Sequence, residues 1–518
     1  MLYPLLCYHW GRAEEPTKTL TYLELAGEQA LRAGAYQEAV DFLADAVSRS
    51  GAVQPAPDAL RQARWHRQLG DAYEGLGRLP ESRQHAERAV ALLGWPVPAT
   101  RLRLLGDLAG QALRHGSRRI RPLRLLGGAR TGRGAALEAG RAYERLAMLN
   151  YYASARVPGV SAVLHAVNLA ERVGPSPELA RAYGTMSYVA NIVQLHSLAG
   201  SYTRWAREIA READDLPALA WVLETTCAAD ISVGNWTAAR EGITEGLRIA
   251  QHLGDQRRWN ELSVSQALVL YHQGEFGRLA EWSAEMAARA SHADDPHRKA
   301  HVLLMEALHL LPKGRTDAAV PRLQEAAQLL TGRGARADEI LTDGVLALAC
   351  LRRHDQEQAR LAAGRAARLI AQAQPGAVHI FEGYAGVAEV YLSLWEAGDH
   401  AAARPARQAC AALRQYARAI PIARPRAWLW QGLGAHLSGH HRRGLAAWDK
   451  SLAAAGRLAM PCEQGRAHYQ IGRHLPAGDP AQQAHLTRAG EIFADIGALY
   501  EVSQVQVAMS RGTDPTRQ

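Results

Sequence analysis

A repeat of about 40 residues runs through the middle of the chain and constrains its fold more than any other feature. Glycines that interrupt helix-forming segments recur at equal intervals, at Gly234, Gly274 and Gly314. A second series of segments rich in Gly, Pro and Asp keeps the same step, at positions 174, 214, 254, 294, 334 and 374. These residue types end or cap helices. Each period therefore predicts two helices of roughly 15 to 17 residues, an ordinary helix length.

The residues within one period resemble the tetratricopeptide repeat, whose signature places Leu-Gly, Tyr, Gly and Ala at fixed offsets. The best match lies at Leu69, Gly70, Tyr73 and Gly77. Gly34 and Ala39 hold equivalent places near the start, and Gly398 and Gly439 hold them near the end. We find no sustained apolar and polar alternation of period two, which a strand would require. The resemblance implies an all-α, right-handed superhelical solenoid of about ten to eleven helix pairs.

Breaks in the repeat register divide the chain into five segments. Residues 94–140 depart from the register and contain Pro-rich flanks, an amphipathic stretch around Leu102, Leu105, Ala109 and Ala112, and an Arg-rich stretch. We expect an inserted helix followed by a basic loop. The predicted divisions are N-terminal helix pairs at 1–93, the basic insertion at 94–140, regular repeats at 141–380, looser repeats at 381–510 and a tail at 511–518.

The positive charge of the chain is concentrated in that insertion. The net charge is +9, and residues 101–133 contain nine arginines and one acid, Asp107. The remainder is close to neutral, which argues against direct nucleic-acid binding along the solenoid. A basic patch of this kind is either a solvated loop or a contact for an acidic protein, a membrane surface or nucleic acid. The candidate partner-binding residues are Arg114, Arg118, Arg119, Arg121 and Arg124.

Cysteine usage and hydropathy bear on the environment of the chain. The five cysteines are scattered and form no CxxC motif, so they predict buried thiols in a reducing cytoplasm and no disulfide or zinc framework. No run of about 18 uncharged apolar residues predicts a membrane span. The N-terminal stretch MLYPLLCYHW lacks a basic leader and a cleavage site, so it is a poor signal peptide.

Motifs that could carry chemistry have simpler explanations in this sequence. The stretch GGARTGRG at 127–134 lacks the Lys and hydroxyl residue of a phosphate-binding loop. The paired acids in READD and HADDP precede helices, where carboxylates cap backbone N–H groups. Two histidine groups, one at His436, His440 and His441 and the other at His292, His297 and His301, are interpreted as solvated turns. We therefore predict no catalytic, cofactor or metal-binding residues and no enzymatic activity; a catalytic site in the groove is the remote alternative.

Three further stretches resemble the helical region that follows the ATPase module in bacterial regulators built from a class III adenylate or guanylate cyclase domain, an AAA-type ATPase and helical repeats. They are YHWGRAEEPTKTLTYLELAGEQALRAGAYQEAVDFLADAV, HAERAVALLGWPVPAT and AYERLAMLNYY with VLHAVNLAERVGPSPELARAYG. The likeness covers roughly residues 8–380. This chain has no cyclase carboxylates in context, no Walker loop and no helix-turn-helix, so no catalytic residue carries over.

This resemblance implies a scaffold or sensor module that binds protein partners, an ATPase or cyclase domain among them, through a concave groove. The alternative is the sensor arm of a signal-transduction ATPase that regulates transcription, without its DNA-binding domain. Because an ATPase precedes the equivalent segment in those proteins, we expect Leu5, Leu6 and Trp10 to be more exposed to solvent than in a natural cap.

Overall fold

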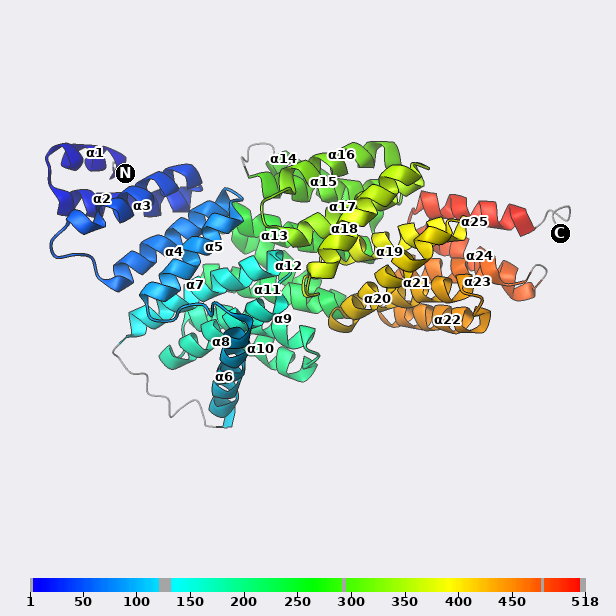
Figure 1. The fold of residues 1–518 in the computed structure, drawn as a ribbon, viewed down its shortest axis with the longest axis horizontal. Coiled ribbons are helices and arrows are strands. Elements are labelled where there is room, and N and C mark those ends of the chain that lie inside the picture. The colour runs from blue at the N-terminus through cyan, green and yellow to red at the C-terminus, as the bar shows by residue number, and fades with distance from the viewer. Residues whose placement is uncertain (1–2, 121–131, 291–294, 477–478, 513–518) are drawn as a thin grey trace.

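The protein is described by a computed structural model that covers residues 3–120, 132–290, 295–476 and 479–512. Within these ranges the chain is all-α and contains no strand. Most helices form antiparallel pairs joined by short turns, as the sequence repeat predicts (Figure 1). The pairs are α2 (Pro16–Ala33) with α3 (Tyr36–Arg49), α4 (Ala59–Gly75) with α5 (Leu79–Leu92), α7 (Arg133–Tyr152) with α8 (Arg156–Val173), α9 (Pro177–Ile192) with α10 (His196–Glu212), α11 (Leu216–Val233) with α12 (Trp236–Leu253), α13 (Gln256–His272) with α14 (Phe276–Ala290), α15 (Pro296–Leu310) with α16 (Thr316–Leu330), α17 (Arg336–Arg352) with α18 (Gln356–Gln372), α19 (Phe381–Glu396) with α20 (Ala403–Ala419), α21 (Arg424–Leu437) with α22 (His441–Arg457), and α23 (Pro461–His474) with α24 (Pro480–Asp495).

Three helices stand outside this pairing. Helix α1 (Tyr3–Arg12) covers the N-terminal end, α25 (Leu499–Gly512) covers α24 at the other end, and α6 (Arg101–Ile120) lies between the second and third pairs. Short 3₁₀ turns occupy η1 (Ser50–Ala52), η3 (His400–Ala402) and η4 (Pro421–Ala423). The first helix of the next pair, α7, already begins at Arg133, inside the segment 94–140 that the register break marks as the insertion.

The turn within each central pair repeats one backbone conformation once per period. Positions 154, 194, 234, 274, 314 and 354 all have φ between +50° and +79°. Only three of these six residues are glycine; the others are Ser154, Gln194 and His354. The left-handed residue ends the first helix, and the next backbone N–H bonds back to that helix, as Asn235 N–H does to the Asp230 carbonyl oxygen at 2.9 Å. The repeat is therefore more regular in conformation than in sequence.

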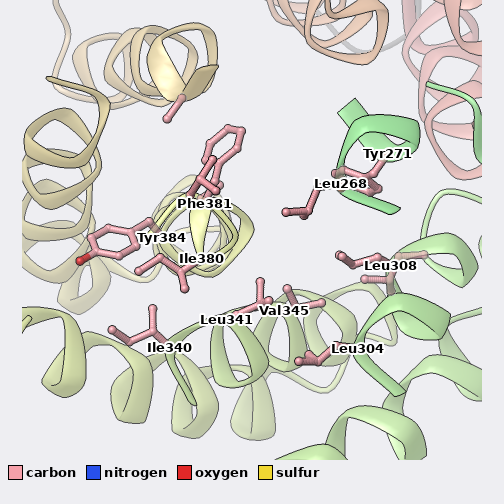
Figure 2. Close-up of a cluster of buried hydrophobic side chains, with 14 of the residues drawn as sticks. Leu268, Tyr271, Leu304, Leu308, Ile340, Leu341, Val345, Ile380, Phe381 and Tyr384 are labelled. Carbon is pink, nitrogen blue, oxygen red and sulfur yellow. The ribbon is translucent and has the colours of Figure 1, made fainter. Parts of the chain in front are cut away.

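The first helix of each central pair is buried on nearly every side. In α17, all residues from Ala337 to Cys350 are buried except Glu339, and α11 and α19 have similarly long buried stretches. Figure 2 shows part of this interior, where Leu268 of α13, Leu304 and Leu308 of α15, and Leu341 and Val345 of α17 face one another. Second helices such as α12 instead bury one stripe of residues.

Contacts between residues about 220 positions apart close the superhelix on itself. Trp236 Nε1–H donates to the Leu458 carbonyl oxygen at 2.6 Å, and Gln194 Nε2–H donates to that of Arg418 at 2.8 Å. A Cβ on Gly274 would meet Ile496, which repeats the same separation. One superhelical turn thus takes between five and six periods, and the next turn packs directly onto it. These contacts narrow the space between successive turns without filling it.

Opposite charges link the first helices of successive pairs. Arg61 bonds to Glu24, Arg141 to Glu178 and Arg181 to Glu144, at 2.8, 2.5 and 2.5 Å. The two partners are separated by a constant interval in the sequence, close to one period. Arg426, which is fully buried, pairs in the same way with Glu463. A buried charge is costly without its partner, so the Arg426 pair in particular favours one register between neighbouring repeats, whereas Arg61 and Arg141 remain partly exposed.

Helix α11 is long and apolar enough by composition to cross a membrane, with a mean hydropathy of 1.2 over 18 residues. It is the one helix of this kind among the described residues, and 67% of it is buried inside the protein. It contacts α9, α12 and α13. Its apolar character is thus explained by its place in the core.

Candidate functional site

Helix α6 projects from the body of the solenoid and packs on α8 (Figure 1). Its sequence alternates apolar and polar residues with helical spacing, and the two faces have unexpected environments. An amphipathic surface helix normally turns its apolar stripe toward the core. In α6 the leucines Leu102, Leu105 and Leu113 are exposed, with 83, 54 and 74% of their surface accessible. The side that packs on the protein carries Asp107, Gln111 and His115 together with two partly buried leucines, Leu104 and Leu108.

The inner face of α6 is held by a hydrogen-bond network to α8. The Asp107 carboxylate accepts from Ser161 Oγ at 2.9 Å and from His165 Nε2 at 2.9 Å. Asn168 Nδ2 donates to the Gln111 side-chain and backbone oxygens, at 2.9 and 3.0 Å. Gln111 is buried despite its polarity, since its amide is bonded in this way. One turn further on, His115 contacts Tyr202 of α10.

The protonation states of this network follow from burial and bonding. Burial alone would raise the pKa of Asp107, but hydrogen bonds from His165 and Ser161 outweigh it and hold that pKa below its usual value. Burial lowers the pKa of His165, against the opposing effect of Asp107. The Asp107 carboxylate is therefore ionised, and a neutral His165 donates its Nε2–H to it. The His165 ring is also stacked on Tyr143, with ring centroids 4.3 Å apart.

The outer face of α6 forms a surface that we call the leucine stripe, consisting of Leu102, Leu105, Ala109 and Leu113. All four side chains are exposed. The arginines Arg101, Arg103 and Arg114, which are exposed as well, lie along the two edges of the stripe. A contiguous exposed apolar surface with a polar rim is typical of a protein-interaction site. Exposure of this surface to water is unfavourable, since burial of one leucine side chain contributes about 1.5–3 kcal/mol of favourable free energy.

The structure describes the predicted arginines only in part. Arg114 lies on α6 and is exposed. Arg118 and Arg119 fall in the last turn of α6, where the backbone is described. Arg121 and Arg124 lie outside the described residues, as does most of the Gly-rich segment 127–134. Of the predicted cluster, Arg114 can be placed with its side chain, and it lies at an edge of the leucine stripe.

The predicted repeat residues occupy turns and close helix contacts. Gly34, Gly77, Gly398 and Gly439 end first helices or begin the following turn with φ between +69° and +99°, as Gly234, Gly274 and Gly314 do. Ala39 and Leu69 are buried, and Tyr73 stacks on His85. Gly70 lies close to α5: a Cβ there would stand 3.2 Å from the Ser82 carbonyl oxygen.

The histidine groups interpreted as solvated turns behave differently from one another. His440 and His441 are exposed, whereas His436 is partly buried against His474. The interpretation is wrong for His301, which has 4% of its surface exposed and faces Asp338 in the interior together with His297. The apparent loop around DDP ends at Pro296, so both histidines lie on the inward side of α15. His292 lies outside the described residues.

The N-terminal helix is partly exposed. Leu5 has 48% of its surface accessible, while Leu6 and Trp10 are half-buried and Cys7 is buried against the first pair. All five cysteines are buried and unpaired.

The interior contains a cavity of about 150 Å³. Its walls are mainly apolar side chains of α7, α8, α9, α11 and α13, closed by residues 374–379, with Tyr151 and Tyr188 among the polar groups. A space of that size has room for a few waters or a benzene-sized molecule. It is too small for a polypeptide; a wider space of about 490 Å³ lies between α9, α10 and α11 on one side and residues 421–458 of the next superhelical turn on the other.

Comparisons with known proteins give little beyond the fold. No protein-family model matches the chain. No curated protein matches its sequence. Among solved structures it is similar to the crystal structure of yeast Tom70, at 12% identity and a TM-score of 0.34, over 97% of this chain and 98% of that one. Function must therefore be argued from the residues of this chain.

Sequence analysis missed the direction in which α6 faces. The amphipathic stretch was evident, but either side of such a helix could have packed on the solenoid. A signal exists in hindsight: Asp107, Gln111 and His115 recur every four residues, and each can bond to a buried polar group. The partners of Asp107 and Gln111, at 161, 165 and 168, lie on α8, and Tyr202, the partner of His115, lies on α10; neither helix has a matching pattern in the sequence.

Proposed function

We propose that the protein is a non-catalytic regulatory module that binds a protein partner through the leucine stripe of α6. The observation that carries this proposal is the exposure of Leu102, Leu105 and Leu113 on a helix whose opposite face is anchored by hydrogen bonds. An anchored helix presents its apolar side in a fixed geometry, so little conformational entropy is lost when a partner covers it.

The basic rim of the stripe indicates the chemistry of the partner. Arg101, Arg103 and Arg114 border the stripe, and the segment 101–133 has eight more positive than negative charges. Helix-in-groove and helix-on-helix recognition pair apolar stripes and use the flanking charges for specificity. The partner that fits is an amphipathic helix with leucine-like residues on one side and Asp or Glu on both edges.

We further propose that this helix belongs to an ATPase or nucleotide-cyclase module in the cytoplasm. The support is the resemblance of residues 8–380 to the helical region of cyclase–ATPase regulators, together with the buried, unpaired cysteines. In such a system, the conformation of the repeats would influence the partner through its contact with α6.

The proposal can be tested with the full chain and three labelled peptides, by fluorescence anisotropy. One peptide is a helix with leucines on one side and glutamates elsewhere; the second replaces glutamate by lysine, and the third scrambles the leucine spacing. We expect binding of the acidic amphipathic peptide alone, weakening as salt is added because the charges are exposed.

Substitutions on the stripe locate the binding surface. Leu102→Ser with Leu113→Ser should weaken peptide binding by about 10-fold or more, since two leucines lose their burial. Leu361→Ser is the control: Leu361 is also exposed, with 52% of its surface accessible on α18, and this variant should bind as wild type. Equal loss in the control, or sedimentation with anionic vesicles in place of peptide binding, would overturn the proposal.

A further inference from the structure

A second site lies inside the superhelix, where three imidazoles converge on one carboxylate. Asp338 of α17 is fully buried. Its Oδ2 is 2.6 Å from Nε2 of His297, and its Oδ1 is 3.3 Å from Nε2 of His301 and 3.0 Å from Nε2 of His379. The histidines come from the first turns of α15 and from the segment that precedes α19. We propose that these four side chains bind one zinc ion.

Hydrogen bonding within the cluster does not satisfy all of its members. His297 and His301 each bond to one oxygen of Asp338. His379 has 9% of its surface exposed, and its Nε2 is close to the carboxylate, but this nitrogen has no hydrogen bond of acceptable geometry. A buried polar atom without a partner costs free energy. A metal ion among the three Nε2 atoms would give each of them a ligand bond.

The types of ligand and their spacing suit zinc. Zinc takes His nitrogen and carboxylate oxygen at about 2.0–2.2 Å in a tetrahedral site, which separates neighbouring ligand atoms by roughly 3.3 Å. The contacts to Asp338 span 2.6–3.3 Å, close to that separation. The ligand atoms of His297, His301 and Asp338 all lie within 4.8 Å of one another; His379 is not part of this group, so its ring must move further than the other two to complete the site.

Two neighbours can hold the imidazoles in the tautomer that a metal needs. When Nε2 binds zinc, Nδ1 carries the proton and must donate it. Nδ1 of His379 faces Tyr151 Oη at 3.1 Å, and a hydroxyl can accept as well as donate. Nδ1 of His301 lies 3.3 Å from Nδ2 of Asn260, which only donates, so the Asn260 amide must turn over and present its oxygen when the ion binds.

The surroundings are accessible and negatively charged. His301 and His379 line the 150 Å³ cavity, whereas His297 lines a smaller space next to Asp295 and Arg298. The cluster thus lies between the 150 Å³ cavity and a space of about 20 Å³. The second carboxylate at the site, Glu261, accepts a hydrogen bond from Tyr152 at 2.9 Å and adds a further negative charge.

A zinc ion at this point would connect segments that are distant in sequence. The segment 373–380, which carries His379, also accepts a bond from Tyr188 Oη at the Gly376 carbonyl oxygen, at 2.6 Å. Its Gln374 N–H donates to the Ser154 carbonyl oxygen at 2.8 Å. The ion would join α15 and α17 to a segment already bonded to α9 and to the turn after α7. It should therefore stabilise the contact between successive superhelical turns.

The test uses the full chain, stripped of metal by a chelator and dialysed. Isothermal titration with ZnCl₂ should show one equivalent bound, and thermal unfolding should shift to higher temperature with zinc. CoCl₂ in place of zinc should produce the visible absorption of tetrahedral cobalt. Absence of stoichiometric binding of either ion would overturn the proposal.

Substitutions separate a metal site from a hydrogen-bonded cluster. Glutamine in His379→Gln or His301→Gln keeps an N–H donor for Asp338 but is a poor zinc ligand, so each should keep its circular dichroism spectrum and lose at least about 100-fold in affinity. Tyr151→Phe should cost about 10-fold. His440→Gln with His441→Gln, in the exposed group, should bind as wild type. Retained affinity in both His379→Gln and His301→Gln, or loss in the exposed pair, would show that zinc binds elsewhere.

Discussion

At the scale of single residues, glycines set how closely first helices approach. Helices α17 and α19 touch backbone to backbone through Gly344, Gly383 and Gly386. A Cβ on Gly344 would overlap the Gly383 carbonyl oxygen and Cα, and one on Gly386 would overlap the Gly344 carbonyl oxygen. This contact leaves no room for adjustment, because the obstacle is backbone and cannot change rotamer.

Gly344→Ala should therefore lower the free energy of unfolding by about 3 kcal/mol, the upper part of the range for overpacked cores. Gly364→Ala, in α18 of the same pair, is the matched control. Its nearest neighbour is Tyr391 Oη at 3.7 Å, so it should instead gain about 0.5–1 kcal/mol of helix propensity. Urea denaturation measures both; similar effects at the two positions would contradict the described contact.

A buried histidine makes stability depend on pH. His272 of α13 has 4% of its surface exposed and stacks on Phe381, with ring centroids 5.5 Å apart. Burial lowers its pKa from 6.5 to about 4, with Glu382 opposing and Arg426 assisting. Between about pH 4 and pH 6.5, His272 is thus neutral in the folded protein and protonated in the unfolded chain. Stability is fully present above pH 6.5 and is lost as the pH falls from 6.5 toward 4.

Between pH 7 and pH 5 this one group should remove about 2 kcal/mol of stability. His272→Gln has no proton to gain, so the difference between its unfolding free energies at the two pH values should be smaller by that amount. Urea titrations at pH 7 and pH 5 provide the measurement. An unchanged pH dependence in the variant would show that His272 is protonated in the folded state.

At the scale of elements, the sequence pattern predicted most helices and could not orient α6. Turn residues and the regular repeat spacing placed the helix pairs, because ends of helices depend on local backbone chemistry. The outward face of α6 depends on Ser161, His165 and Asn168, which lie on another helix and have no local signature. The His297–Asp338 contact was missed for the same reason: it joins two first helices one period apart, and the DDP sequence suggested only a loop.

Helix α6 should detach when its polar anchor is removed. Asp107→Ala leaves His165 and Ser161 without their acceptor and should weaken docking by about 1.5–3 kcal/mol, as for a charged hydrogen-bond partner. Trypsin should then cleave faster at Arg101, Arg103 and Arg114, without a change in global stability. Leu113→Ser alters the opposite face and should leave cleavage unchanged. Equal cleavage of Asp107→Ala and wild type would mean that the polar face does not hold the helix.

At the scale of the whole molecule, successive superhelical turns contact one another. Sequence analysis suggested protein binding along an open concave groove, since repeats of this type leave such a surface. The chain instead brings distant superhelical turns into contact, as at Trp236 and Leu458. The sequence of a single period cannot predict these contacts, because they depend on the rotation between neighbouring repeats, summed over five or six periods.

Loss of one hydrogen bond between successive superhelical turns should increase hydrogen exchange in two segments that are distant in sequence. Trp236→Phe keeps the aromatic ring but removes the donor to Leu458, at a cost of about 1 kcal/mol. Hydrogen exchange should accelerate both at the α11–α12 turn and at the α22–α23 turn. In Trp282→Phe, which loses a bond to the Ser263 carbonyl oxygen within its own pair, exchange should accelerate locally only. A purely local effect of Trp236→Phe would contradict closure.

The central claim is that a partner binds on the outer face of α6 and not on the concave side. Hydrogen exchange of the full chain, with and without the acidic amphipathic peptide, tests it most directly. The account predicts slower exchange in α6, residues 101–117, with little change in α11, α13, α15 and α17. Slower exchange in those first helices, with α6 unaffected, would contradict it.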